Sequence, residues 1–251
     1  MSLPVEVVAA HEKGNCILFV GRRAVLEAVK AEGGAFPGQK KLARLLAGKK
    51  SEFDDALKGA ERRLGPAGLG REMAALLDCS QIEPGVFHLG AVTNFNLIFT
   101  TCQDDLLERA AAAQGIKTEV FYRGDTLPVA EDGVLRIYKF WGGFERPDTL
   151  FIWPEGQDQQ SLPADLRKSL RKLLTRNVLF FVGYRPDESE FAWVYDELET
   201  GFGGKLPRSH LAVAQGKISD YFWQKWVWKG LLLFTADPSY VMKQLEDGKN
   251  G

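Results

Sequence analysis

The segment FTTCQDDLLE, residues 99–108, joins an apolar run to a helical pattern. The run 97–101 (LIFTT) has the short apolar composition of a buried strand. The pattern that follows, 104–113, opens with Asp104 and Asp105, two acids that suit the positive end of a helix dipole. Because open α/β sheets hold ligands where parallel strands give way to helices, this junction predicts both the fold class and the place of a functional site.

Apolar runs alternate with helical patterns along the rest of the chain. Strands are predicted at 15–21, 97–101, 117–123, 134–141, 149–153, 177–184, 210–215 and 231–235. Helices are predicted at 40–47, 52–64, 69–77, 104–113, 163–174, 191–198 and 218–229. Continuous apolar strands separated by helices indicate a mostly parallel sheet that is covered on both faces. We expect an α/β fold, Rossmann-like and doubly wound, in one domain over 1–247, with a helical insertion at about 36–80 and a tail at 248–251.

The composition of the 251 residues excludes several classes of function. The 32 basic and 33 acidic residues give a net charge of -1, which provides no electrostatic case for nucleic acid or an anionic membrane as a partner. No apolar run approaches the ~20 residues that span a bilayer. The three cysteines form no CxxC pair, and no metal-ligand spacing is present. We therefore expect a cytoplasmic protein with reduced thiols and no metal.

The first predicted strand ends in a glycine turn, at Gly21. A strand that ends in glycine and feeds a helix has the geometry that cradles a pyrophosphate, provided that small residues let the ligand approach the backbone. Here Arg22 and Arg23 follow the glycine. Their guanidinium groups can pair with a phosphate or a carboxylate, and they can equally fill the pocket or point to solvent.

Four segments, in this order and spacing, resemble the sirtuin-like domains of bacterial defence and effector proteins. They are FVGRRAV from Phe19, TTCQDDLLE from Thr100, YKFWGG from Tyr138 and FFVGYRPD from Phe180. The resemblance covers nearly the whole chain. It implies a site at which an Asn, a His and a glycine-rich loop position NAD for cleavage of its glycosidic bond.

Carried onto this chain, the resemblance places unsuitable side chains at the catalytic positions. The Asn position is Cys102 and the His position is Trp141, while Asp104 keeps the acid of the motif. An indole has no basic nitrogen and a thiol cannot replace an amide that both donates and accepts hydrogen bonds. We therefore expect a site without catalysis and without a required cofactor. The positions at which a nucleotide would bind are Gly21, Arg22, Arg23, Thr101, Asp104 and Gly183.

Two alternatives remain open at this stage. One is an NAD-cleaving hydrolase with atypical residues, and the other is a sensor that binds NAD or ADP-ribose through Arg22, Arg23 and Asp104 without cleaving it. The indole of Trp141 can either stack on a ligand ring or plug an empty cleft, and we favour the plug.

The segment 221–228 (YFWQKWVW) holds half of the six tryptophans of the chain. Packing against the last strand explains part of this density. The functional interpretation is an aromatic face that docks a protein partner or a second copy, with Trp223, Trp226 and Trp228 at the interface. Together these inferences predict an inactive sirtuin-like module that acts in protein association, within a bacterial defence or signalling assembly by resemblance.

Overall fold

A computed structural model describes residues 3–24, 39–48, 50, 52–77, 79–127, 131–150, 162–185, 187–200, 202, 204, 206, 210–214 and 218–249. Its centre is a seven-stranded sheet in the order β3-β4-β2-β1-β5-β6-β7, and every pairing is parallel. The strands are β1 (Cys16–Val20), β2 (Leu97–Thr100), β3 (Thr118–Tyr122), β4 (Leu135–Lys139), β5 (Val178–Val182), β6 (His210–Ala214) and β7 (Leu231–Thr235).

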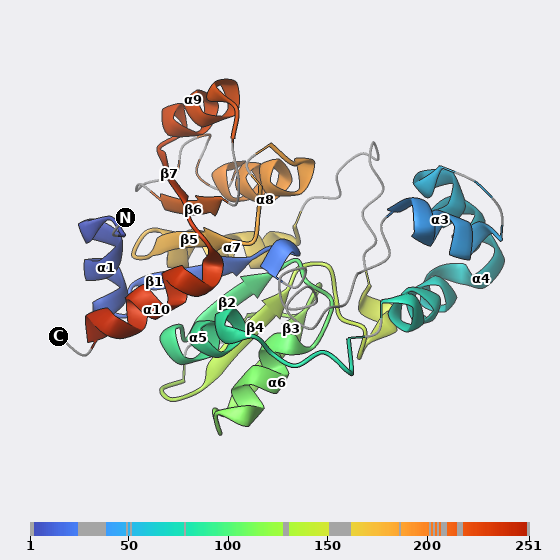
Figure 1. Cartoon of the computed structure of the whole chain (residues 1–251), viewed down its shortest axis with the longest axis horizontal. Helices are drawn as coiled ribbons and strands as arrows, with labels where there is room; N and C mark the ends of the chain where they lie inside the picture. The colour runs from blue at the N-terminus through green and yellow to red at the C-terminus, as the bar shows by residue number, and fades with distance from the viewer. Residues whose placement is uncertain are drawn as a thin grey trace.

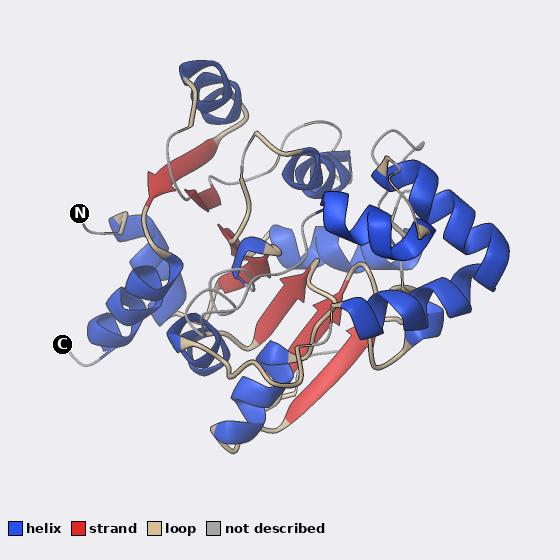
Figure 2. Ribbon diagram, turned by 45° about the vertical axis from the view of Figure 1, so that its right-hand side comes forward, coloured by secondary structure: helices blue, strands red, loops and turns tan. Residues whose placement is uncertain are grey.

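Helices cover both faces of this sheet (Figures 1 and 2). One layer consists of α1 (Val5–Glu12), α5 (Val86–Asn94), α6 (Leu106–Ala113) and α10 (Pro238–Lys249). The other layer consists of α7 (Ala164–Leu174), α8 (Ser189–Thr200) and α9 (Asp220–Trp228). None of the helices in the described part of the chain combines the length and the apolar character needed to cross a membrane.

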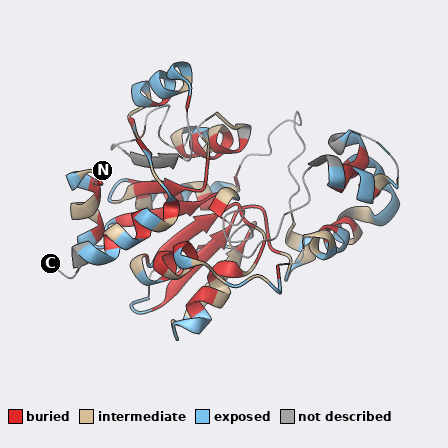
Figure 3. Ribbon diagram, in the orientation of Figure 1, coloured by how far each residue is buried: buried red, intermediate tan, exposed pale blue. Residues whose placement is uncertain are grey.

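The central strands are buried on both faces, as Figure 3 shows by their red colour. Alternate residues of β1 point to opposite sides, so Leu18 packs in the core under α5 and α10 while Phe19 packs in the core under α7 and α8. The Phe19 ring stacks on Phe99 at 5.0 Å and lies 4.9 Å from Phe181. Burial on both sides is the reason that these strands are continuously apolar in sequence.

Helices α3 (Gln39–Ala47) and α4 (Phe53–Leu76) stand apart from the sheet, at the right of Figure 1. They bury a small core of their own, which includes Leu42, Leu57 and Met73. Inside α4 the backbone of Gly65 departs from helical geometry with φ 69° and ψ 169°, which kinks the helix. The insertion therefore packs largely on itself, and other elements surround the carboxyl ends of the sheet strands.

The predicted fold class is confirmed, and the described strands show that the sheet is wholly parallel. The strand predicted at 149–153 is not found in its described part, because Pro147–Thr149 forms a short 3-10 helix, η1; positions 151–153 lie outside the described residues. Helices α1, α5 and α10 were not predicted. The two helices predicted at 52–64 and 69–77 are the two arms of the kinked α4.

Candidate functional site

The candidate site lies at the carboxyl ends of β1, β2 and β5. After β1 the chain builds β2, β3 and β4 on one side and then crosses to build β5 on the other side of β1. Ligands of open α/β sheets bind at such a topological switch point. The motif positions that the sequence predicts as cofactor-binding, apart from Asp104, meet here.

The two glycine turns that follow β1 and β5 press against each other at the switch point. The Gly21 N–H donates to the Val182 carbonyl at 2.8 Å, and the Arg23 N–H donates to the Gly183 carbonyl at 3.0 Å. A Cβ on Gly21 would lie 2.5 Å from the Gly183 oxygen, and a Cβ on Gly183 would lie 2.6 Å from the Gly21 oxygen. The glycines thus allow one turn to approach the other.

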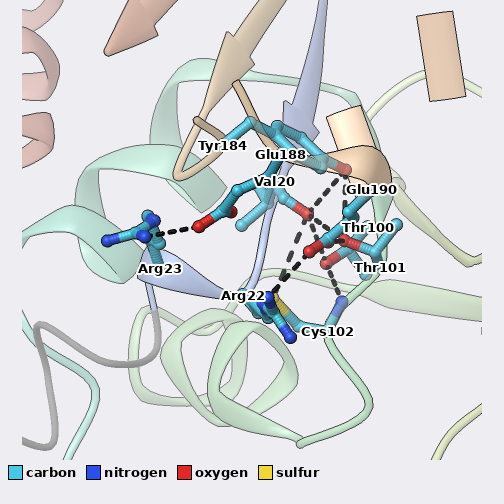
Figure 4. A network of polar contacts seen from close by, with 9 residues as sticks. All are labelled: Val20, Arg22, Arg23, Thr100, Thr101, Cys102, Tyr184, Glu188 and Glu190. Atoms are coloured by element: carbon cyan, nitrogen blue, oxygen red, sulfur yellow. Dashed lines mark hydrogen bonds and ion pairs between the residues drawn. The ribbon is translucent and has the colours of Figure 1, made fainter. Parts of the chain in front are cut away.

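Side chains that bond to one another occupy the space beside these turns (Figure 4). The Thr101 hydroxyl lies 2.5 Å from Oε1 of Glu190 and 3.2 Å from the Tyr184 hydroxyl. The Tyr184 hydroxyl also donates to the Val20 carbonyl at 3.2 Å. Glu190, Tyr184 and Thr101 are all buried, with exposed fractions of 4%, 3% and 2%.

Both arginines of the first turn are ion-paired with acids at the start of α8. Nε of Arg22 lies 3.2 Å from Oε2 of Glu190, and the Arg23 guanidinium bonds to Glu188. Figure 4 shows the two pairs on either side of the turn. The positive charge that could attract a phosphate is therefore already matched by carboxylates of this chain.

Burial controls the protonation of this network. It raises the pKa of Glu190 above its usual value, an effect that Arg22 and the Thr101 hydrogen bond oppose. It also raises the pKa of the Tyr184 phenol well above its usual value, and the nearby Glu190 charge adds to that rise. The tyrosine therefore remains neutral and acts as a hydrogen-bonding group rather than as a base.

Cys102 and Asp104 both lie in the buried turn between β2 and α6. Burial raises the pKa of the Cys102 thiol well above its usual value, and Asp104 raises it further, so the thiol is protonated and is a poor nucleophile. Oδ1 of Asp104 accepts a hydrogen bond from the Leu106 N–H at 3.1 Å. This acid therefore satisfies a free amide at the first turn of α6.

Trp141, at the position where the resemblance has a histidine, is buried with an exposed fraction of 7%. Its ring lies 6.4 Å from that of Trp193 on α8 and belongs to the core on that side of the sheet. Its backbone carbonyl accepts a hydrogen bond from the Gln103 amide at 3.2 Å. The indole is thus held by the α8 layer.

A second buried polar cluster surrounds Lys139 at the end of β4. Its ammonium lies 2.5 Å from Glu108 and 3.0 Å from Glu145, and it donates to the Asp104 carbonyl at 2.7 Å. The lysine is fully buried, and burial raises the pKa of Glu108 to about 7. The lysine thereby ties β4 to the start of α6 and to the turn that carries Asp104.

Sequence reasoning did not identify Tyr184, Glu188, Glu190 or Lys139 as members of this region. Tyr184 and Lys139 lie inside motif segments, which is a usable signal. Glu188 and Glu190 give no such signal in the sequence, because acids at the start of a helix ordinarily face solvent. Among the residues that the structure describes, no three His, Cys, Asp or Glu side chains gather into a metal site.

The aromatic segment on α9 divides between core and surface. Trp228, Tyr221 and Trp223 are exposed by 88%, 69% and 39%. Trp226 is fully buried, with its ring 4.9 Å from Phe191 and 5.1 Å from Tyr195. The prediction that Trp226 lies at an interface is therefore wrong, because its face of the helix packs on α8.

Comparisons with known proteins agree with this fold. A family model described as SIR2-like domain matches residues 96–229. A Sir2 enzyme studied for its mechanism and regulation superposes with a TM-score of 0.51 at 12% identity, over 99% of this chain and 98% of that one. A mutant Sir2 homologue in complex with ADP-ribose gives 0.52 at 14% identity, over 99% and 97%. Another mutant, in complex with 2′-O-acetyl ADP-ribose, gives 0.52 at 12% identity over the same shares. No curated protein matches the sequence.

Proposed function

We propose that this chain, which belongs to the SIR2-like domain family, is a module that does not cleave NAD and that acts through protein association. The observation that carries the proposal is the set of buried contacts at the switch point. Thr101, Tyr184 and Glu190 bond to one another there, and Glu190 also pairs with Arg22. A carboxylate beside the glycine turn repels the phosphates that a dinucleotide would bring to the same place.

The residues at the motif positions favour the same conclusion. Cleavage of a glycosidic bond needs a group that can activate the attacking nucleophile. The Trp141 indole has no basic nitrogen, and the Cys102 thiol is buried and protonated. Asp104 is buried and accepts from the Leu106 amide, so its side chain already has a structural role in α6.

An NAD incubation tests the absence of cleavage directly. The purified full chain is incubated with NAD, and nicotinamide release is followed by chromatography. We expect no release above a protein-free blank. Release that is lost in an Asp104→Asn variant and retained in the matched neighbour Asp105→Asn would overturn the proposal, since it would assign chemistry to the one acid that the motif retains.

Protein association is the positive half of the proposal, and α9 supports it. Trp228, Tyr221, Val227 and Trp223 form an exposed apolar group on this helix, with Trp228 exposed by 88%. Exposed tryptophan and tyrosine are the residues that dominate binding energy in protein interfaces. We propose, from the family resemblance alone, that such a module acts within a bacterial defence or signalling assembly.

Binding of NAD or ADP-ribose without cleavage is the second candidate. The observation that favours it is the position of Arg22 and Arg23, which lie at the switch point with partly exposed side chains, 53% and 30%. A rise in melting temperature with millimolar ADP-ribose that is lost in Arg22→Gln/Arg23→Gln would establish it. We expect no rise in melting temperature in the wild type, because Glu188 and Glu190 are ion-paired with the two guanidinium groups.

A further inference from the structure

An open surface cavity of about 280 Å³ lies between α7 and the end of α8, away from the switch point. Its lining consists of Arg167, Lys168 and Arg171 from α7 and Thr200 from α8. Residues four apart share one face of a helix, so Arg167 and Arg171 project to the same side. This concentration of positive charge departs from the chain as a whole, whose net charge is -1.

The three cations of this cavity have no carboxylate partner among the described residues. The ion pairs of that part of the chain lie elsewhere: Asp196 and Glu199 of α8 are both paired with Lys229. The remaining acid of that turn, Glu197, accepts the Leu162 N–H at 2.9 Å. The lack of carboxylate partners in the described part of the chain distinguishes this cavity from the turn after β1, where glutamates pair with both Arg22 and Arg23.

The surroundings also decide which groups would contact a ligand. The Arg171 guanidinium lies 5.9 Å from the centroid of the Phe202 ring, a cation–π distance that favours one orientation of the side chain. The Thr200 hydroxyl donates to the Asp196 carbonyl at 2.7 Å. Recognition of a ligand therefore falls to the three cations, and they select for negative charge.

We propose that this cavity binds a small anion with two or more negative charges on phosphate groups. Two arginines match phosphate oxygens with paired N–H donors, and the volume admits a diphosphate-sized group. A long polyanion is disfavoured, because the rest of the chain supplies no excess positive charge to hold it. The proposal is independent of the switch point and of NAD cleavage.

Titration of the full chain with inorganic pyrophosphate tests this proposal. Calorimetry is carried out at low salt on the wild type and on two double variants, one within α7 and one at its C-terminal end. Arg167→Gln/Arg171→Gln removes two cations of the cavity, and we expect it to weaken binding at least tenfold. Lys172→Gln/Arg176→Gln removes the same charge from exposed positions beyond the cavity lining, and we expect a change of less than twofold.

Four outcomes would overturn the proposal. They are no binding of millimolar pyrophosphate to the wild type, equal losses in the cavity variant and its control, loss of binding in Arg22→Gln/Arg23→Gln, and tighter binding of a single-stranded oligonucleotide through the two arginines of the cavity. The first three would show that the cavity does not recognise the anion, and the fourth would show that it serves a nucleic acid instead. Melting curves without ligand establish that each variant is folded.

Discussion

His88 is a buried titratable residue on α5 whose protonation links stability to pH. Its exposed fraction is 1%, and burial, with a smaller effect of Arg109, lowers its pKa from 6.5 to about 4. Between pH 6.5 and pH 4, His88 is protonated in the unfolded chain but stays neutral in the folded chain. The free energy of unfolding therefore falls as the pH falls through this window, by about 3 kcal/mol from this residue.

Urea unfolding between pH 7 and pH 4 measures this dependence. The matched variant is His88→Leu, which has a side chain of similar size and no proton to bind. We expect the variant to lose less stability than the wild type over the same range, while the two differ little at pH 7. Identical slopes for both proteins would show that carboxylates alone produce the acid sensitivity.

Some residues of the site at the switch point can be predicted from the sequence and others cannot. The resemblance predicts Gly21, Thr101 and Gly183 because they stand in its motif segments, and Gly21 is also indicated by the apolar run that it ends. Glu190 was not predicted, because it contacts Thr101 across 89 positions of sequence. Helix α8 comes to lie beside the end of β2 only because the chain crosses from β4 to β5 on the other side of β1. The local sequence pattern gives no information about that crossing.

Among the elements, the turn after β5 is sensitive to an added methyl group. Gly183 has φ +77°, and a Cβ there would lie 2.6 Å from the Gly21 oxygen and 2.9 Å from the Ala24 nitrogen. The substitution Gly183→Ala therefore combines backbone strain with a steric clash against the turn after β1. We expect it to lower the free energy of unfolding by about 2–5 kcal/mol, measured by urea unfolding.

Gly230 provides the matched control for this substitution. It has nearly the same backbone geometry, φ +82°, but a Cβ there would meet no atom within 4 Å. Gly230→Ala should lose only the strain contribution, about 1–2 kcal/mol. Equal losses at the two positions would mean that the contact between the glycine turns adds nothing to stability.

The start of α8 is the element that neutralises the arginines of the first turn. A Glu188→Gln/Glu190→Gln variant removes both carboxylates and leaves Arg22 and Arg23 free to pair with phosphate. We expect millimolar ADP-ribose to raise the melting temperature of this variant but not that of the parent. Both proteins carry Arg167→Gln/Arg171→Gln, so that the α7 cavity does not contribute.

Two exposed acids of α4 provide the control for this gain of binding. Glu61→Gln/Glu72→Gln changes the net charge by the same amount, far from the switch point. It should leave the melting temperature insensitive to ADP-ribose. A rise in this control would attribute the effect to net charge, and no rise in the α8 variant would mean that other groups, such as Tyr184, close the site.

The sequence predicts some helices and strands better than others. The strands were found because burial on both faces makes them continuously apolar, and the arms of α4 were found because Gly65 and Pro66 interrupt the helical pattern. Helix α5, Val86–Asn94, was missed because five of its nine residues are buried and its sequence shows little alternation between polar and apolar faces. Its packing on α10, which lies at the far end of the described chain, is a tertiary feature that the local sequence does not contain.

At the scale of the whole molecule, the apolar surface is unevenly distributed. Two cores cover the faces of the sheet, and a third lies within the helical insertion. Helix α9 lies at the outer side of one layer, at the top of Figure 1, and it contributes Trp226 to the core. Phe222 packs against the same core, while Tyr221, Trp223 and Trp228 stay exposed, so association through this helix would bury apolar surface.

The last prediction concerns self-association through this helix. We expect the sedimentation coefficient of the wild type to rise with concentration, and the variant Tyr221→Ser/Trp228→Ser to weaken the assembly at least tenfold, or by about 1.4 kcal/mol. Val5→Ser is the control, because Val5 is 79% exposed on α1, a helix that packs on the opposite face of the sheet from α9. A wild type that stays monomeric at every concentration, or an equal loss in Val5→Ser, would contradict a role for α9. Retention of the melting temperature in both variants would exclude unfolding as the cause.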